Sequence, residues 1–204
     1  MDEIELKAAE VVARNIELLE GAYDLAVNKM DLMLYEATRE ILEDKQKLLL
    51  WEYDFGGELN DYPWLAPTEW RAEGEVAGGN YNLVCYIDRG GESETWLAEF
   101  AGGPARCVCF SISTNTVSGV RKLGRLSGTI TAEVSELGEL GFSFDASDFV
   151  LKLQLKFDRE EIAKGFADGD LSTALAPIGE ALDKINAARP ILDRVEQAVR
   201  RFNA

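Results

Sequence analysis

The sequence predicts an α+β fold, in which an antiparallel sheet of about five to six strands is flanked by a long N-terminal helix, or a helical hairpin, and by C-terminal helices. Helical spacing of apolar residues dominates residues 1–50 and 158–204, whereas strand-like alternation dominates residues 68–157. Short glycine-rich breaks separate the alternating runs, which favours hairpins over crossover helices. Because no flexible linker divides these segments, we expect residues 1–204 to form a single composite domain.

The first 50 residues contain no proline and carry apolar side chains in alternating steps of four and three, which keeps them on one stripe of a helix. The first stripe comprises Val12, Ile16, Leu19, Tyr23, Ala26, Met30, Met33 and Ala37, and a second comprises Val27, Met30, Leu34, Ala37, Ile41 and Leu48. Gly21 interrupts the pattern, so the spacing leaves open whether one helix continues through it or the chain turns back into a hairpin.

Residues 51–67 form a connector in which Gly56-Gly57, Pro63 and Pro67 exclude a helix. The stretch from residue 48 to residue 70 has five acidic and six aromatic residues and no base. Aromatic rings provide large contact areas, and carboxylates attract a basic partner. We therefore predict a partner-binding site at Trp51, Glu52, Tyr53, Asp54, Glu58, Asp61, Tyr62, Trp64 and Glu69. Two alternatives are that the rings cap the core, or that the tryptophans face a sugar or small-molecule pocket.

Alternating residues predict five strands within residues 68–157. They lie at Tyr81–Asp88, Trp96–Phe100, 107–112, 130–134 and 149–157. The last is the clearest, because its odd positions are all apolar and its even positions after Val150 are polar. We expect the basic stretch 119–125 to be a solvated loop.

Residues 158–204 return to helical spacing. Asp158 followed by Glu161 resembles a capping box, and the turn Asp168-Gly169-Asp170 ends that short helix. Pro177 and Pro190 are each expected to open or kink a later helix.

The chain has 37 acidic and 21 basic residues, no histidine and a net charge of −16. Residues 1–110 hold 23 acids and 9 bases, so the excess lies in the front half. Such a surface repels nucleic acid and anionic membranes and attracts basic proteins. No apolar run approaches the length of a membrane span, and the acidic start does not resemble a signal peptide, so we expect a cytoplasmic protein of a cell or an infected host.

Most catalytic templates are excluded, because triads, dyads and metal sites that need histidine have none. Cys85, Cys107 and Cys109 are an odd number and are expected to be buried thiols rather than disulfides. Aspartate pairs such as Asp145 with Asp148 and Asp168 with Asp170 are explained by turns. We expect no metal and no cofactor.

The function expected from these observations is that of a non-enzymatic acidic protein-binding module. It would act on a basic protein surface, as an inhibitor of a nucleic-acid-binding protein would, with carboxylates in place of phosphates. One alternative is a structural protein that self-associates, for example as a homodimer, through helices with coiled-coil spacing. The other is an enzyme or ligand carrier with a carboxylate-lined pocket.

Overall fold

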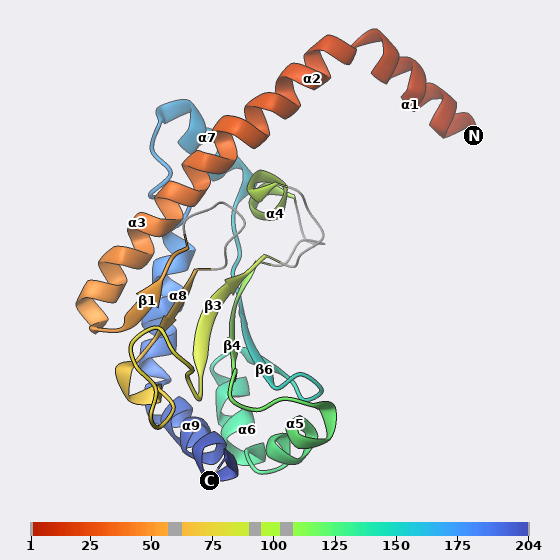
Figure 1. Ribbon diagram of the computed structural model, residues 1–204. Coiled ribbons are helices and arrows are strands. Elements are labelled where there is room, and N and C mark those ends of the chain that lie inside the picture. The colour runs from red at the N-terminus through yellow and green to blue at the C-terminus, as the bar shows by residue number, and fades with distance from the viewer. Residues whose placement is uncertain (1, 57–62, 90–94, 103–107, 204) are drawn as a thin grey trace.

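The computed structural model describes residues 2–56, 63–89, 95–102 and 108–203. It confirms the predicted α+β fold, with a long N-terminal helix, an antiparallel sheet and C-terminal helices (Figure 1). The strands are β1 (Glu52–Asp54), β2 (Trp64–Ala66), β3 (Val84–Asp88), β4 (Cys109–Ser113), β5 (Phe142–Asp145) and β6 (Val150–Gln154). They lie in the order β1-β2-β3-β4-β6-β5, and each neighbouring pair is antiparallel.

Helical segments occupy both ends of the chain, a short turn after β2 and three places within residues 96–139. They are α1 (Glu3–Arg14), α2 (Ile16–Leu25), the π-helix η1 (Ala26–Met30), α3 (Asp31–Leu49), the 3-10 turn η2 (Thr68–Trp70), α4 (Trp96–Ala101), α5 (Val120–Ser127), α6 (Thr131–Glu139), α7 (Arg159–Asp168), α8 (Ala176–Ala187) and α9 (Arg189–Asn203). Among the described residues, no helix is long and apolar enough to cross a membrane.

The N-terminal helix is not a hairpin, and it runs through Gly21 without interruption. A capping box begins it, in which the Asp2 side chain accepts the Glu5 N–H and the Glu5 side chain accepts the Asp2 N–H. The interruption lies instead at Asn15, whose side-chain amide donates to the Val11 carbonyl at 2.8 Å. The π-helix η1 then shifts the angular register before α3, and the helix ends at Leu50 with a left-handed φ of 56°.

The buried face of α3 follows neither of the two predicted stripes. It consists of Asp31, Leu34, Tyr35, Thr38 and Leu42, which recur at the spacing of one helical face. The face was missed because two of its five members are polar. This face packs towards α4, and α3 also contacts α8 (Figure 1).

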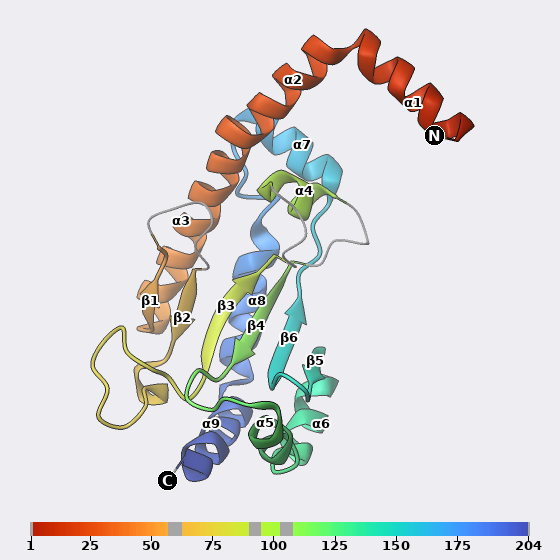
Figure 2. The same cartoon turned by 45° about the vertical axis from the view of Figure 1, so that its right-hand side comes forward.

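The central strands confirm the predicted alternation. Cys85 and Ile87 on β3 pair with Ile112 and Phe110 on β4, and all four side chains are buried. On β6 and the residues that flank it, Phe149, Leu151, Leu153 and Leu155 are buried as expected. Helices α8 and α9 lie behind this apolar face, and one hydrophobic cluster joins them to the sheet and α3 (Figure 2).

Three sequence predictions in the middle of the chain were wrong. Trp96–Phe100 forms α4 rather than a strand, because Thr95 caps the helix by accepting the Ala98 N–H at 3.1 Å. Residues 130–134 begin α6, with Ile130 and Leu137 buried at helical spacing. The basic stretch 119–125 falls mainly in α5 rather than in a loop. Short apolar runs fit both periods, and of these three helices only α4 has a side-chain cap at its start.

The connector and the C-terminal segment contain elements that the pattern identified in part. Connector residues form β1 and β2, which were not predicted as strands. Asp158 caps α7 by accepting the Glu160 and Glu161 N–H groups, as expected, and Gly169 ends it with a φ of 73°. Pro177 opens α8, and Pro190 lies at the start of α9.

Candidate functional site

The predicted connector site is divided between core and surface. Trp51 is buried, Glu52 and Trp64 are half-buried, and Tyr53, Asp54 and Glu69 are exposed. The remaining three predicted residues, Glu58, Asp61 and Tyr62, lie outside the described residues. Trp51 packs beside Trp70 with 6.3 Å between ring centroids, which agrees with the core-capping alternative for these two rings.

Two carboxylates of the predicted site, Glu52 and Glu69, contact bases of the same chain. Glu52 forms an ion pair with Arg71 and accepts the Tyr81 hydroxyl. Glu69 lies 3.0 Å from the Arg189 guanidinium at the edge of α9. Asp54 remains at the surface, where it accepts the Gly56 N–H. The connector therefore has fewer open acids than its sequence suggests, and its binding role stays a prediction.

A second candidate surface is the helical arm, which we define as α1 and α2, residues 3–25. The arm extends away from the rest of the molecule in both views (Figures 1 and 2). None of its described side chains is buried. Its large exposed apolar residues are Ile4, Leu6, Val11, Val12, Ile16, Leu18, Leu19, Tyr23 and Leu25, of which Ile4 is 78% and Leu18 is 71% exposed. Exposed apolar residues gathered on one segment make the arm a candidate interaction surface.

On α2, apolar and acidic residues occupy separate sides of the helix. Ile16, Leu19 and Tyr23 recur at steps of three and four, and Leu18 and Leu25 extend the apolar arc. The acids Glu17, Glu20 and Asp24 form one narrow stripe opposite. Within the described part of the chain, Glu17 and Glu20 have no ion pair.

A small groove lies on α3, next to the loop that follows α7. It has a volume of about 250 Å³. Met33, Ala37 and Ile41 supply apolar atoms from α3, and Glu36 and Glu40 place carboxylates beside them. Apolar surface flanked by acids therefore recurs on the same long helix.

The sheet face away from α8 carries a charged cluster of Asp88, Ser111 and Lys152. Lys152 Nζ and Ser111 Oγ lie 3.4 Å and 3.2 Å from Asp88 Oδ2. Burial opposes the charge on Lys152, but Asp88, Cys109 and Tyr86 together outweigh it and hold the pKa of Lys152 above its ordinary value. The amine therefore stays protonated at neutral pH and cannot act as a general base.

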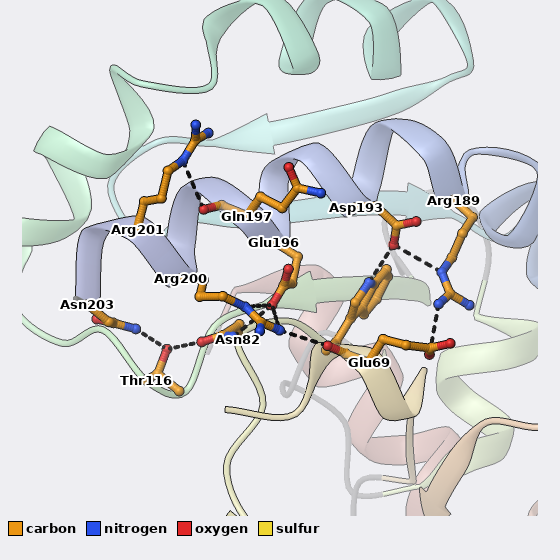
Figure 3. Close-up of polar contacts among 11 residues, drawn as sticks. Glu69, Asn82, Thr116, Arg189, Asp193, Glu196, Gln197, Arg200, Arg201 and Asn203 are labelled. Carbon is orange, nitrogen blue, oxygen red and sulfur yellow. Dashed lines mark hydrogen bonds and ion pairs between the residues drawn. The ribbon is translucent and has the colours of Figure 1, made fainter. Parts of the chain in front are cut away.

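A polar network anchors α9 to the sheet and to η2 (Figure 3). The buried Glu196 carboxylate accepts from Asn82 Nδ2 at 2.8 Å and from Arg200 Nη2 at 2.8 Å. Trp70 Nε1 donates to Asp193 at 2.7 Å, and Arg189 bridges Asp193 and Glu69. Three of these contacts, Asn82–Glu196, Trp70–Asp193 and Arg189–Glu69, join segments more than 100 residues apart, so the network ties distant parts of the chain together.

Two of the four predicted turn aspartates, Asp145 and Asp170, have the expected role. Asp145 accepts the Ser147 hydroxyl and N–H, and Asp170 accepts the Ser172 N–H. These hydrogen bonds lower the pKa of both carboxyls. Among the described residues, no three acidic or cysteine side chains gather into a metal-binding group. No protein-family model matches the chain, and neither a curated protein nor a solved structure is significantly similar to it.

Proposed function

We propose that this protein is a non-enzymatic binding module that holds a basic partner protein on its helical arm. The observation that carries the proposal is the arm itself, which exposes nine large apolar side chains and buries none of those described. A partner helix or groove would cover residues spaced at i, i+3 and i+7, such as Ile16, Leu19 and Tyr23.

Charge favours a basic partner over a second copy of the chain. Residues 2–25 hold seven acids and only two bases, Lys7 and Arg14. Two arms packed together would bring like charges into contact, whereas lysines or arginines beside an apolar anchor would pair with Glu17 and Glu20. An inhibitor of a nucleic-acid-binding protein fits this description, because its target presents such a basic surface.

The direct test uses a synthetic peptide rather than an unknown ligand. An amphipathic helical peptide with leucines on one face and lysines on the other is titrated by fluorescence anisotropy, beside a version with glutamates. We expect the lysine peptide alone to bind, and to bind more weakly as salt rises and the Debye length shortens to about 10 Å at 0.1 M. Deleting residues 2–25 should abolish binding without unfolding the body.

A matched pair of charge variants locates the interaction. The triple variant E17Q/E20Q/D24N removes the acidic stripe, and D148N/E139Q/E160Q removes three exposed acids from the body. Only the first should weaken binding. Equal affinity for both peptides, or affinity that survives arm deletion, would reject the proposal. A concentration-dependent dimer mass that is lost on arm deletion would instead support the self-association alternative.

A further inference from the structure

An uncharged hollow of about 510 Å³ lies on the sheet face away from α8, at the end of β3. Trp64, Val84 and Tyr86 of β2 and β3 line it. The turn Gly78-Gly79-Asn80, together with Tyr81 and Asn115, completes the lining. This volume falls in the range of small-molecule sites, and aromatic walls with a few placed polar groups are typical of them.

Trp64 is the accessible indole of the protein. Trp51, Trp70 and Trp96 are 2%, 1% and 2% exposed, whereas Trp64 is half-buried and lines the hollow. Tyr81 supports it from the core side, with 5.0 Å between ring centroids. Opposite Trp64 in the strand register lies Tyr86, which also lines the hollow. The two rings offer a fixed apolar platform.

Two asparagine side chains lie at the rim. Each uses one of its two amide groups, the carbonyl oxygen or the NH₂, in a hydrogen bond within the protein, and the other group is left for a ligand. The Asn115 carbonyl oxygen accepts the Tyr81 N–H at 2.9 Å, which leaves its NH₂ group as a donor. The Asn80 NH₂ group donates to Glu75 at 2.8 Å, which leaves its carbonyl oxygen as an acceptor. Gly79 makes room for this arrangement, since a Cβ there would lie 2.5 Å from the Glu75 carboxylate.

We propose that this hollow binds a neutral saccharide, with one ring stacked on Trp64 and its hydroxyls on Asn80 and Asn115. Sugar hydroxyls both donate and accept, so neighbouring hydroxyls satisfy the Asn80 oxygen and the Asn115 NH₂ group together. A sugar ring also presents an apolar C–H face to an aromatic ring. The site is separate from the arm and does not depend on the function proposed for it.

Other ligand classes match the same walls less well. A nucleotide needs cations for its phosphates, but no described lining residue is basic and Glu75 lies nearby. A proline-rich peptide also stacks on aromatic rings, but its proline nitrogens have no hydrogen to give to the Asn80 oxygen.

The test follows the four indole N–H signals in a ¹⁵N-correlated NMR spectrum during titration with glucose, galactose, mannose, N-acetylglucosamine and their disaccharides. The Trp64 signal is assigned as the one missing from Trp64→Leu. We expect at least one sugar to move it selectively, with a dissociation constant on the order of 1 mM for a single ring.

Variants separate the site from the rest of the fold. Trp64→Leu lacks the reporting indole, so its binding is followed through the backbone amide signals of residues 78–81 in the same spectrum, and it should weaken about tenfold through loss of the aromatic face. Asn80→Ala, at an exposed position, should weaken it about two- to tenfold by removing one hydrogen bond. Tyr53→Leu is the matched control, because Tyr53 is an exposed ring that pairs with Leu65 on the other face. No shift with any sugar, a shift unchanged in Asn80→Ala, or a shift with a proline-rich peptide alone would overturn the proposal.

Discussion

The Asp31 carboxylate accepts the backbone N–H of Leu97 at 2.8 Å, so the long N-terminal helix caps α4 across 66 positions of sequence. Asp31 is only 4% exposed, and burial raises its pKa, while the Leu97 and Trp96 N–H groups and Arg89 oppose that shift. The contact fixes α4 against the base of the arm, where α3 and α4 pack together.

Removing this cap should destabilise the fold. We expect Asp31→Ala to lower the free energy of unfolding by about 1–2 kcal/mol, as loss of a helix cap does. Asp31→Asn should cost less, because its amide oxygen still accepts and no charge is buried. Urea unfolding at neutral pH ranks the variants, and an alanine variant as stable as the wild type would show that the cap has no energetic role.

Asp31 also determines in which direction the stability of the fold changes with pH. Because the folded pKa of Asp31 is raised, the native state binds the proton more tightly than the unfolded state. Its contribution is therefore most favourable at low pH and is lost as pH rises through the folded pKa. The stability of the wild type minus that of Asp31→Asn should fall over that interval. A difference that rises with pH would contradict the shift.

Hydrogen exchange should distinguish the arm from the body. A helix without tertiary contacts is marginal in water, so amides of residues 3–25 should exchange far faster than those of α8. α8 provides the internal comparison, because Ile178, Leu182 and Ile185 are fully buried on it. If the amides of the arm were as protected from exchange as those of α8 in dilute solution, the arm would already be covered by other protein surface.

The sequence predicted those parts of the fold whose side chains follow one period over many residues. The alternation around β6 and the spacing of the C-terminal helices are of this kind. It failed at α4, where a segment of six residues depends on a cap from Thr95 and on a second from Asp31. Contacts of that range leave no local pattern in the sequence.

The candidate surfaces were predictable to a similar extent. Four of the arm's apolar residues, Val12, Ile16, Leu19 and Tyr23, were identified, but apolar stripes are normally core, and only the structure leaves them exposed. The connector acids were identified too, but their pairing with Arg71 and Arg189 depends on tertiary folding. Trp64 belonged to the predicted site, whereas Asn80 and Asn115 carry no signal until the turn and β4 bring them together.

The Cys85 thiol should be inert in the native protein. It is fully buried, and burial together with Cys109 raises its pKa well above the ordinary value. Because the thiolate is the reactive form, alkylation followed by peptide mapping should leave Cys85 unmodified until denaturant is added. Modification of Cys85 under native conditions, at the rate of a free thiol, would show that β3 opens readily.

The network at α9 predicts an order of energetic importance among its members. Asn82 and Glu196 are both buried, so Asn82→Ala leaves a buried carboxylate with one partner fewer and should cost about 1–3 kcal/mol. The side chain of Arg200 is 49% exposed, so its ion pair with Glu196 is screened by water, and Arg200→Met should cost less even though it also loses the hydrogen bond to the Glu69 carbonyl.

Arg39→Met, which breaks an exposed pair with Glu43, is the control and should be nearly neutral. Urea unfolding of the three variants tests this order. Added salt should reduce the loss of stability only in Arg200→Met, because salt screens the ion pair that this variant removes. A larger loss for Arg200→Met than for Asn82→Ala would mean that the ion pair, rather than the buried amide, holds α9 to the sheet.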